Sequence, residues 1–390
     1  MKICIIFFNI GGYHVARLEA TRRACEGRGW SLSAIQVAGN TTEHPWGDIS
    51  LSNYVITLKS RHVGSDFSLG DSSPLLDALD SVDPDAVAIP GWGFDFARAA
   101  LAWVRKRGRI AILMSESKED DSPRVWWKEL AKRLFSVRHF HSAIVGGSKH
   151  RAYLRRLGMM EERIFYGYDI VDNGYFIDSV DAIRNRQNPL DIPTCVRERR
   201  YFLAVNRFIP RKNLAALVIA FSEFLKGSEV ADAWDLVLLG DGPQKDELVQ
   251  LVSRLDLQNR IHFPGFQTYS QISHWYSFAN VFIHPALSEQ WGLVVNEAMA
   301  AGLPVVLSQR CGCYPELMVE HETGISFDPE SHQQLTAAMI RLSENDSLRA
   351  FMGQNSRTLI VDKFGPDRFA DGLMACVNAS GIGRQAEVTE

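Results

Sequence analysis

The chain has 390 residues, more than one ordinary hydrophobic core accommodates, so its length indicates two domains. Hydrophobic residues make up 46% of the sequence and charged residues 23%, which is the composition of a globular protein. A net charge of −4 and the lack of any RNA- or DNA-binding motif argue against a nucleic-acid-binding protein.

The first half of the sequence alternates short apolar runs with amphipathic segments, the pattern of a doubly wound α/β sheet. Strands are predicted at 3–8, 33–37, 86–89, 110–114 and 143–145, with helices at 15–27, 74–81 and 95–107. Ligands of such sheets bind at the carboxyl ends of the strands. The apolar run before Asn9 is too short for a signal peptide, and no long apolar run follows, so we expect a cytoplasmic protein.

Two loops at the carboxyl ends of these predicted strands are candidates for ligand contact. The first contains Gly11, Gly12 and His14. It lacks the glycine spacing of a dinucleotide fingerprint, so nicotinamide or flavin binding is not expected. A glycine pair lets the backbone approach a substrate, although such pairs also occur in plain turns. The second loop contains Glu116, which either contacts a ligand or is an ordinary loop acid.

The segment 124–156 is strongly basic, because it contains nine Lys or Arg residues and the single acid Glu129. It also contains apolar side chains at helical spacing, namely Trp126, Trp127, Leu130, Leu134 and Phe135. A helix with apolar and cationic faces is typical of contact with an anionic membrane surface or a phosphorylated acceptor. A core-packed helix with a solvated basic face fits the same pattern equally well.

A polar stretch punctuated by proline, between about residues 178 and 200, predicts a domain boundary. We therefore expect an N-terminal domain at 1–185 and a C-terminal domain at 186–365, followed by a helix at 366–380 and a loose tail at 381–390. The second domain begins with an apolar strand at 201–205.

Two glutamates, Glu289 and Glu297, flank the start of a helix predicted at 293–301. The free amides at such a helix start, those of Gly292, Leu293 and Val294, favour a phosphate. Eight helical steps correspond to about 12 Å, whereas the carboxylate pair of a retaining glycosidase is separated by about 5–5.5 Å. The spacing therefore favours two carboxylates that bind different parts of one long ligand. Two ordinary solvent-facing glutamates are the alternative.

Arg207 and Lys212 follow the strand at 201–205 and supply cations suited to a diphosphate, or are plain surface bases. The six cysteines lack a zinc-binding spacing, and Cys311 and Cys313 are too close together for a zinc knuckle. We therefore expect reduced, mostly buried thiols and no metal.

The glutamate pair and the following Ala-Met-Ala-Ala-Gly-Leu-Pro-Val-Val resemble the donor-site signature of the retaining glycosyltransferases of family four, which have the GT-B fold. Segments 206–213, 236–243 and 261–266 resemble the same family in order and spacing. The resemblance implies two Rossmann-like domains that face a central cleft, and a last helix that crosses back to the first domain.

The resemblance also implies roles for individual residues. Arg207 and Lys212, together with the amides of residues 292–294, should stabilise the leaving diphosphate. Glu289 should bind hydroxyls of the transferred sugar, and Glu297 those of the ribose. Gly265 should lie near the base, and Gly11 and Gly12 against the donor phosphates and the acceptor. His14 and Glu116 are the acceptor-side candidates.

The implied activity is transfer of a hexose-type sugar from a nucleotide diphosphate sugar, UDP favoured over GDP, with retention of configuration. A saccharide or a lipid-linked molecule is the implied acceptor, and no cofactor or metal is required. Many family members carry a histidine where this chain has Ser115-Glu116-Ser117, which leaves the acceptor side open. A sugar-nucleotide epimerase and a weakly active sugar-nucleotide-binding partner protein are the alternatives, and peripheral contact with the inner face of an anionic membrane stays open.

Overall fold

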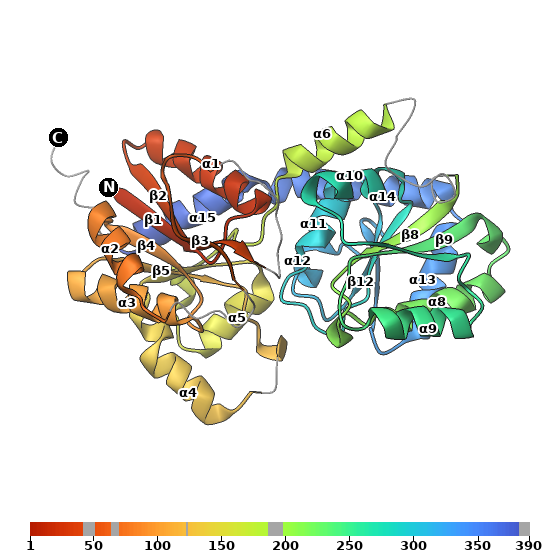
Figure 1. The fold of residues 1–390 in the computed structure, drawn as a ribbon, viewed down its shortest axis with the longest axis horizontal. Coiled ribbons are helices and arrows are strands. Elements are labelled where there is room, and N and C mark those ends of the chain that lie inside the picture. Colours follow the sequence, from red (N-terminus) through yellow and green to blue (C-terminus); the bar gives the residue numbers. More distant parts are fainter. Residues whose placement is uncertain (42–50, 64–69, 122–123, 186–197, 382–390) are drawn as a thin grey trace. The chain divides into compact units, whose positions relative to one another are not determined.

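The computed structural model describes residues 1–41, 51–63, 70–121, 124–185 and 198–381, which form two compact units (Figure 1). Unit 1 comprises Met1–Asp172 and Gly365–Glu390, and unit 2 comprises Asn173–Phe364. Each unit contains one parallel β-sheet with helices packed against it. The prediction of two doubly wound α/β domains is therefore confirmed.

The sheet of unit 1 has seven strands in the order β3-β2-β1-β4-β5-β6-β7. The strands are β1 (Lys2–Phe7), β2 (Ser31–Thr41), β3 (Val55–Val63), β4 (Ala86–Pro90), β5 (Ile110–Ser115), β6 (Ser142–Val145) and β7 (Ile164–Tyr166). The helices are α1 (Gly12–Glu26), α2 (Ser73–Val82), α3 (Asp95–Arg107), α4 (Trp126–Phe135), α5 (Ser148–Arg156) and α15 (Pro366–Ala379). The order of the strands reverses between β1 and β4, which are neighbours.

The central strands of unit 1 are apolar because helices cover both of their faces. All six residues of β5 are buried, and so are five of the six residues of β1. Such continuous apolar runs are expected of parallel strands. Strands β3 and β7 were not predicted from the sequence. Both are edge strands, β3 mixes polar with apolar residues, and β7 has three residues.

The sheet of unit 2 has six strands in the order β10-β9-β8-β11-β12-β13. The strands are β8 (Arg200–Val205), β9 (Trp234–Leu239), β10 (Ile261–Gly265), β11 (Val281–His284), β12 (Val305–Ser308) and β13 (Gly324–Phe327). The helices are α6 (Asn173–Arg184), α8 (Leu214–Gly227), α9 (Lys245–Arg254), α10 (Tyr269–Phe278), α11 (Leu293–Ala300), α12 (Tyr314–Leu317), α13 (His332–Ser343) and α14 (Asp346–Lys363).

The last helix, α15, returns to unit 1 and packs on α1, β6 and β7, as the resemblance implied. Ser142 in β6 donates a hydrogen bond to the carbonyl oxygen of Cys376, at 3.0 Å. Gly372 lies so close to β7 that an added Cβ would be 2.2 Å from the carbonyl oxygen of Tyr166. Only glycine allows this approach, so the close packing of the helix on the sheet depends on that residue.

The division between the units falls at Asp172, earlier than the polar stretch suggested. The following segment forms α6, whose exposed polar side chains resemble a linker in sequence. The helix belongs to unit 2 because Asn173 donates hydrogen bonds to the carbonyl oxygens of Ile360 and Phe364, both at 3.0 Å. Residues 186–197 of the predicted boundary stretch and most of the predicted tail, 382–390, lie outside the described residues.

The five cysteines in the described part of the chain are free and buried, as expected, whereas Cys195 lies outside it. Among the described residues, no helix combines the length and the apolar character that crossing a bilayer requires.

Candidate functional site

The candidate site lies at the carboxyl ends of the central strands of unit 2. Strands β8 and β11 are neighbours, and the strand order reverses between them. In open parallel sheets, ligands bind at such a reversal. Lys212 comes from the loop after β8 and Glu289 from the loop after β11, and the Lys212 ammonium donates a hydrogen bond to Glu289 Oε2. The fold therefore unites two of the residues predicted for the donor site.

The environment of Glu289 keeps this carboxyl group ionised. Its exposed fraction is 8%, and burial alone would disfavour the charge. The hydrogen bond from His284 and the charge of Lys212 outweigh that burial and hold the pKa of Glu289 well below its ordinary value. An ionised carboxylate accepts hydrogen bonds from hydroxyl groups but donates no proton, so this residue is unsuited to act as a general acid.

His284, the last residue of β11, completes this cluster, although no role was predicted for it from the sequence. The residue is fully buried, and its Nε2 lies 3.3 Å from Glu289 Oε2. Burial lowers the pKa of His284 despite the hydrogen bond to Glu289, so the ring is neutral near pH 7. Facing a carboxylate, a neutral ring donates from Nε2. The sequence signal that could have identified His284 is a polar residue at the end of an apolar strand, where the strand reaches the carboxyl edge of the sheet.

Gly292 allows the loop to pass close to this cluster. Its φ of 103° lies in the left-handed region, and an added Cβ would be 3.4 Å from both Glu289 Cγ and His284 Nε2. A side chain here would strain the backbone, and its Cβ would be in van der Waals contact with both groups. Helix α11 begins at the next residue, so Leu293 and Val294 supply amides at a helix N-terminus, as predicted from the sequence.

The second glutamate of the pair is also buried. Glu297 in α11 has an exposed fraction of 1% and accepts a hydrogen bond of 2.7 Å from the hydroxyl group of Tyr276 in α10. Neither glutamate is therefore an ordinary solvent-facing residue. The helix begins at Leu293, so the separation of about 12 Å, which assumed eight helical steps, does not apply as stated.

Three further residues, at the ends of β8 and β10, lie at the same edge of the sheet. Arg207 is exposed in the loop after β8, and Gly265 ends β10 with a φ of 84° and open space beside its Cα. Asn206 is buried, and neither polar atom of its amide has a hydrogen-bond partner among the described residues. Buried polar groups are nearly always satisfied, so the Asn206 amide is suited to a bound ligand.

The remaining predicted residues belong to unit 1. Gly11 is the N-cap of α1, and its backbone amide donates a hydrogen bond of 3.0 Å to His14 Nδ1. The ring of His14 packs edge-on against Phe7, with centroids 4.6 Å apart, so this histidine stabilises the start of α1. Gly12 is the first residue of α1, and Glu116 is partly buried just after β5. All four lie at the carboxyl ends of the sheet of unit 1.

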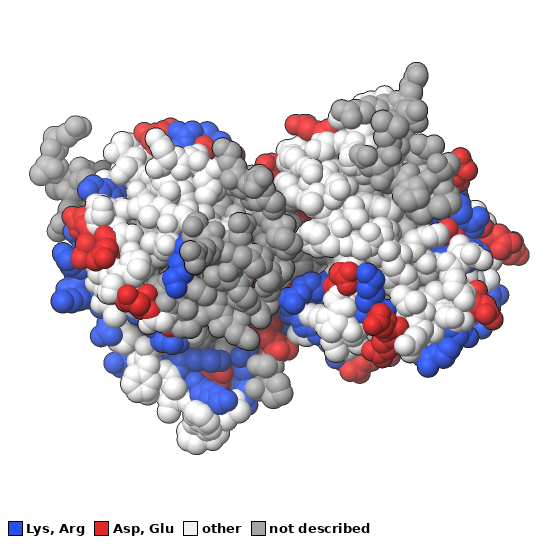
Figure 2. All heavy atoms as spheres, viewed as in Figure 1, with Lys and Arg blue, Asp and Glu red and all other residues white. Residues whose placement is uncertain are grey.

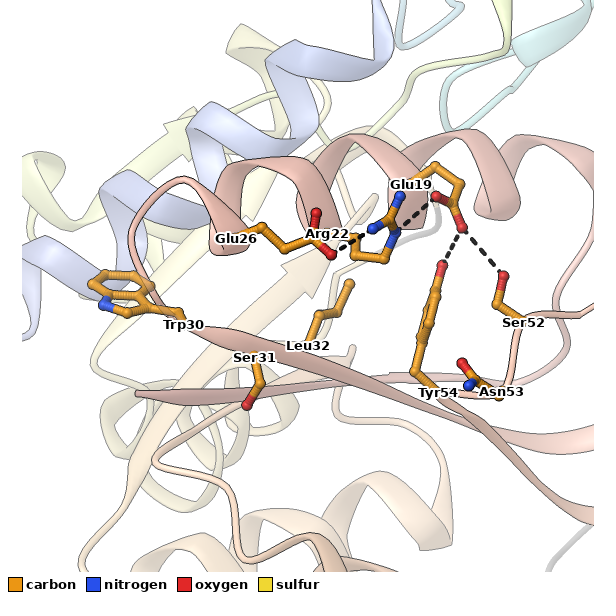
Figure 3. A pocket seen from close by; sticks show the side chains of 9 residues that line it. All are labelled: Glu19, Arg22, Glu26, Trp30, Ser31, Leu32, Ser52, Asn53 and Tyr54. Atoms are coloured by element: carbon orange, nitrogen blue, oxygen red, sulfur yellow. Dashed lines mark hydrogen bonds and ion pairs between the residues drawn. The ribbon is translucent and has the colours of Figure 1, made fainter.

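A separate hollow in unit 1 contains none of these residues (Figure 3). Its lining comes from α1, from the start of β2 with the residue before it, and from the segment before β3, and consists of Glu19, Arg22, Glu26, Trp30, Ser31, Leu32, Ser52, Asn53 and Tyr54. Glu19 accepts hydrogen bonds from the Tyr54 hydroxyl group at 2.6 Å and from Arg22 Nε at 3.0 Å. The charged groups of this hollow satisfy one another, and we assign it no ligand.

Comparison with known proteins places the candidate site in a recognised segment. Residues 192–359 match the family model for glycosyl transferases group 1. The chain is 24% identical over 239 residues to 2-deoxystreptamine N-acetyl-D-glucosaminyltransferase of Niallia circulans, which covers 60% of this chain and 58% of that protein. The chain spans about half the length of the curated relatives it matches first.

Solved structures resemble the whole chain. Sucrose-phosphate synthase from Thermosynechococcus elongatus superposes with a TM-score of 0.73 at 19% identity, covering 100% of both chains. HepE from Anabaena, solved in complex with UDP, superposes with a TM-score of 0.70 at 16% identity, covering 97% of this chain and 100% of that one. At these identities the likeness establishes the fold alone, and it confirms the GT-B fold that the resemblance implied.

Proposed function

We propose that the protein is a glycosyltransferase that takes its sugar from a nucleotide diphosphate sugar bound by unit 2. The observation that carries this proposal is the Lys212–Glu289 ion pair at the reversal of the strand order. Both residues lie inside the segment that matches the group 1 family model. A cation and an ionised carboxylate, side by side at the end of the sheet, suit a ligand that contains both phosphates and sugar hydroxyls.

The ion pair suggests how the donor binds. The diphosphate competes with Glu289 for the ammonium group of Lys212, and Arg207 with the amides of residues 292–294 adds further donors. Glu289, once released from Lys212, accepts hydrogen bonds from hydroxyl groups of the transferred sugar. Its low pKa supports this acceptor role rather than that of a general acid. Stabilisation of the departing diphosphate is then the main catalytic contribution of the protein.

Within this proposal, the sugar is a hexose, its configuration is retained, and UDP is preferred to GDP. The neighbour HepE has been solved with UDP-glucose, which supports a uridine donor. Glu297, oriented by Tyr276, is assigned to the ribose hydroxyl groups, and Gly265 to the side of the base. Because Arg207 and Lys212 supply the positive charge for the diphosphate, we propose that no metal is needed. The acceptor is a saccharide or a lipid-linked molecule, with His14 and Glu116 as the acceptor-side candidates and Gly11 and Gly12 assigned to the donor.

A ligand panel tests the proposal, because a ligand that binds the folded state raises the unfolding temperature. In EDTA, UDP should raise this temperature more than UMP does, since the second phosphate is assigned to Arg207 and Lys212. Lys212→Met should abolish the difference between UDP and UMP, while Lys226→Met, at an exposed position of α8, should preserve it. Equal shifts for UDP and UMP in the wild type would contradict the diphosphate site.

Product analysis separates the alternatives. A glycosyltransferase without its acceptor should release free UDP from UDP-glucose slowly, by hydrolysis. Conversion of the donor into a different, intact sugar nucleotide would instead identify an epimerase. Binding of the sugar nucleotide, with no turnover in the presence of saccharide and lipid-linked acceptors, would identify a binding protein.

A further inference from the structure

Helix α4 in unit 1 exposes its apolar side chains to solvent. The helix has ten residues, and none of them is buried. Exposed fractions reach 77% for Trp126, 74% for Phe135 and 55% for Trp127, and Leu130 and Leu134 are exposed as well. The interpretation of this segment as a core-packed helix is therefore wrong. Isolated exposed apolar residues are common, but five on one short helix indicate an interaction surface.

The polar side of α4 faces the neighbouring helix α5 of the same unit. Glu129 accepts hydrogen bonds of 2.7 Å from Lys132 Nζ and from the hydroxyl group of Tyr153, a buried residue of α5. Lys132 also donates to that hydroxyl group, at 3.0 Å. Amphipathic helices of globular proteins normally turn their apolar side toward the core. In α4 this arrangement is inverted, so intramolecular packing does not account for the apolar side.

Basic side chains border the apolar surface on both edges. At about 100° per residue, the five apolar side chains span about 180° of the helix, and Lys128 and Arg133 fall about 20° beyond its two borders. Both are exposed, and neither forms an ion pair within the described ranges of the chain. Other basic residues of the segment 124–156 do form ion pairs, since Arg151 and Arg155 both pair with Glu161. In Figure 2, Lys and Arg atoms gather beside the uncharged atoms at the lower edge of unit 1.

We propose that α4 docks on an anionic lipid bilayer, with Trp126, Trp127 and Phe135 inserted at the level of the headgroups. Lys128 and Arg133 then lie where they attract anionic headgroups. Aromatic and leucine side chains on one face, with basic residues at the borders, are the composition of helices that lie in a bilayer surface. This inference rests on unit 1 alone and does not require the proposed function of unit 2.

The size of the surface favours lipid over a protein partner. The three exposed aromatic side chains of α4 present roughly 300–500 Å² of accessible surface, since each has about 150–250 Å² and 55–77% of it is exposed. A stable protein interface buries about 800 Å² on each partner. A lipid surface has no such threshold, since each inserted side chain contributes by its own apolar area.

Vesicle sedimentation tests the inference. The full-length protein should pellet with vesicles containing phosphatidylglycerol but not with pure phosphatidylcholine vesicles, and 0.5 M salt should weaken the binding. Trp126→Ser combined with Phe135→Ser should lower the affinity at least tenfold, and Lys128→Glu combined with Arg133→Glu should do the same. Phe351→Ser removes a side chain that is 53% exposed on α14 of unit 2, and it should bind like the wild type.

The same measurements contain the outcomes that overturn the inference. The inference is wrong if the wild type does not bind anionic vesicles, or if it binds neutral vesicles as strongly as anionic ones. It is also wrong if the Trp126/Phe135 variant binds anionic vesicles as strongly as the wild type. Self-association of the wild type that the same variant abolishes, without vesicle binding, would assign the surface to a second copy of the chain. Circular dichroism checks that each variant is folded. UDP-induced stabilisation, measured in parallel, separates a failure of this inference from a failure of the proposed donor site.

Discussion

Lys212 and Glu289 lie 77 residues apart in the sequence, and their ion pair joins the loop after β8 to the loop after β11. Each charge satisfies the other in a poorly exposed place, with 11% and 10% of the two side chains exposed. The pair therefore holds the two loops together, and under the proposed function a donor separates it in order to bind. The proposed function therefore predicts that stability and donor binding are coupled at these two residues.

This coupling predicts an unusual order of stabilities. Lys212→Met leaves the Glu289 carboxylate poorly exposed without its cation, and removing one partner of a buried pair costs about 3–5 kcal/mol, an upper bound for this partly exposed pair. Lys212→Met combined with Glu289→Met removes both charges and should be more stable than the single variant. Urea unfolding measures the difference. A double variant at least as unstable as Lys212→Met would mean that the pair is not coupled.

A second prediction concerns acid. Because Glu289 has a pKa well below its ordinary value in the folded protein, its ionised form stabilises the fold above the unfolded pKa of about 4.3. This contribution is lost as the pH falls from about 4.3 toward the depressed folded value. The difference in unfolding free energy between wild type and Glu289→Gln should therefore be constant from about pH 5.5 to 6 and shrink toward pH 3. A pH-independent difference would contradict the assignment of an ionised carboxylate.

His284 is predicted to act as a positioning residue for Glu289. A hydrogen bond to a charged group contributes about 1.5–3 kcal/mol, so its loss in His284→Phe should lower kcat by roughly 10- to 100-fold. The donor KM should change less, because the phosphate contacts are kept. His284→Gln retains a donor group and should recover part of kcat. Equal losses in the two variants, or a loss confined to KM, would point to a packing role instead.

The elements that could be predicted from the sequence are those whose local hydrophobic pattern matches their environment in the fold. The fully buried β5 is a continuous apolar run, whereas the edge strand β3 needs its pairing with β2 to be identified. The same holds for the site. Glu289 and Glu297 could be predicted as site residues because the flanking helix start and glycine are local features. The partners of these glutamates, His284 and Tyr276, lie on other elements, and only the folded chain brings them together.

Gly372 provides a prediction about the return of the chain to unit 1. Gly372→Ala places a Cβ 2.2 Å from the carbonyl oxygen of Tyr166 and 2.9 Å from the Ile144 side chain, so α15 must shift away from β6 and β7. Overpacking of this kind costs about 1–3 kcal/mol. Gly93→Ala is the matched control, because its added Cβ meets no atom within 4 Å. Urea unfolding should show the loss for Gly372→Ala alone, and similar stabilities of the two variants would refute close packing.

The last prediction separates nucleoside binding from sugar transfer. Tyr276→Phe deletes the hydroxyl group that donates to Glu297 at 2.7 Å but keeps the buried ring. If Glu297 holds the ribose, its looser orientation should weaken UDP binding by about tenfold, the equivalent of one hydrogen bond of about 1.4 kcal/mol. The transfer rate at saturating donor should change little, because Glu289 and Lys212 remain. Tyr201→Phe is the control, since it deletes another buried hydroxyl group, which donates to the carbonyl oxygen of Trp275 at 2.6 Å, and leaves Glu297 untouched. Calorimetry with UDP measures both variants, and equal affinities would remove Glu297 from the ribose site.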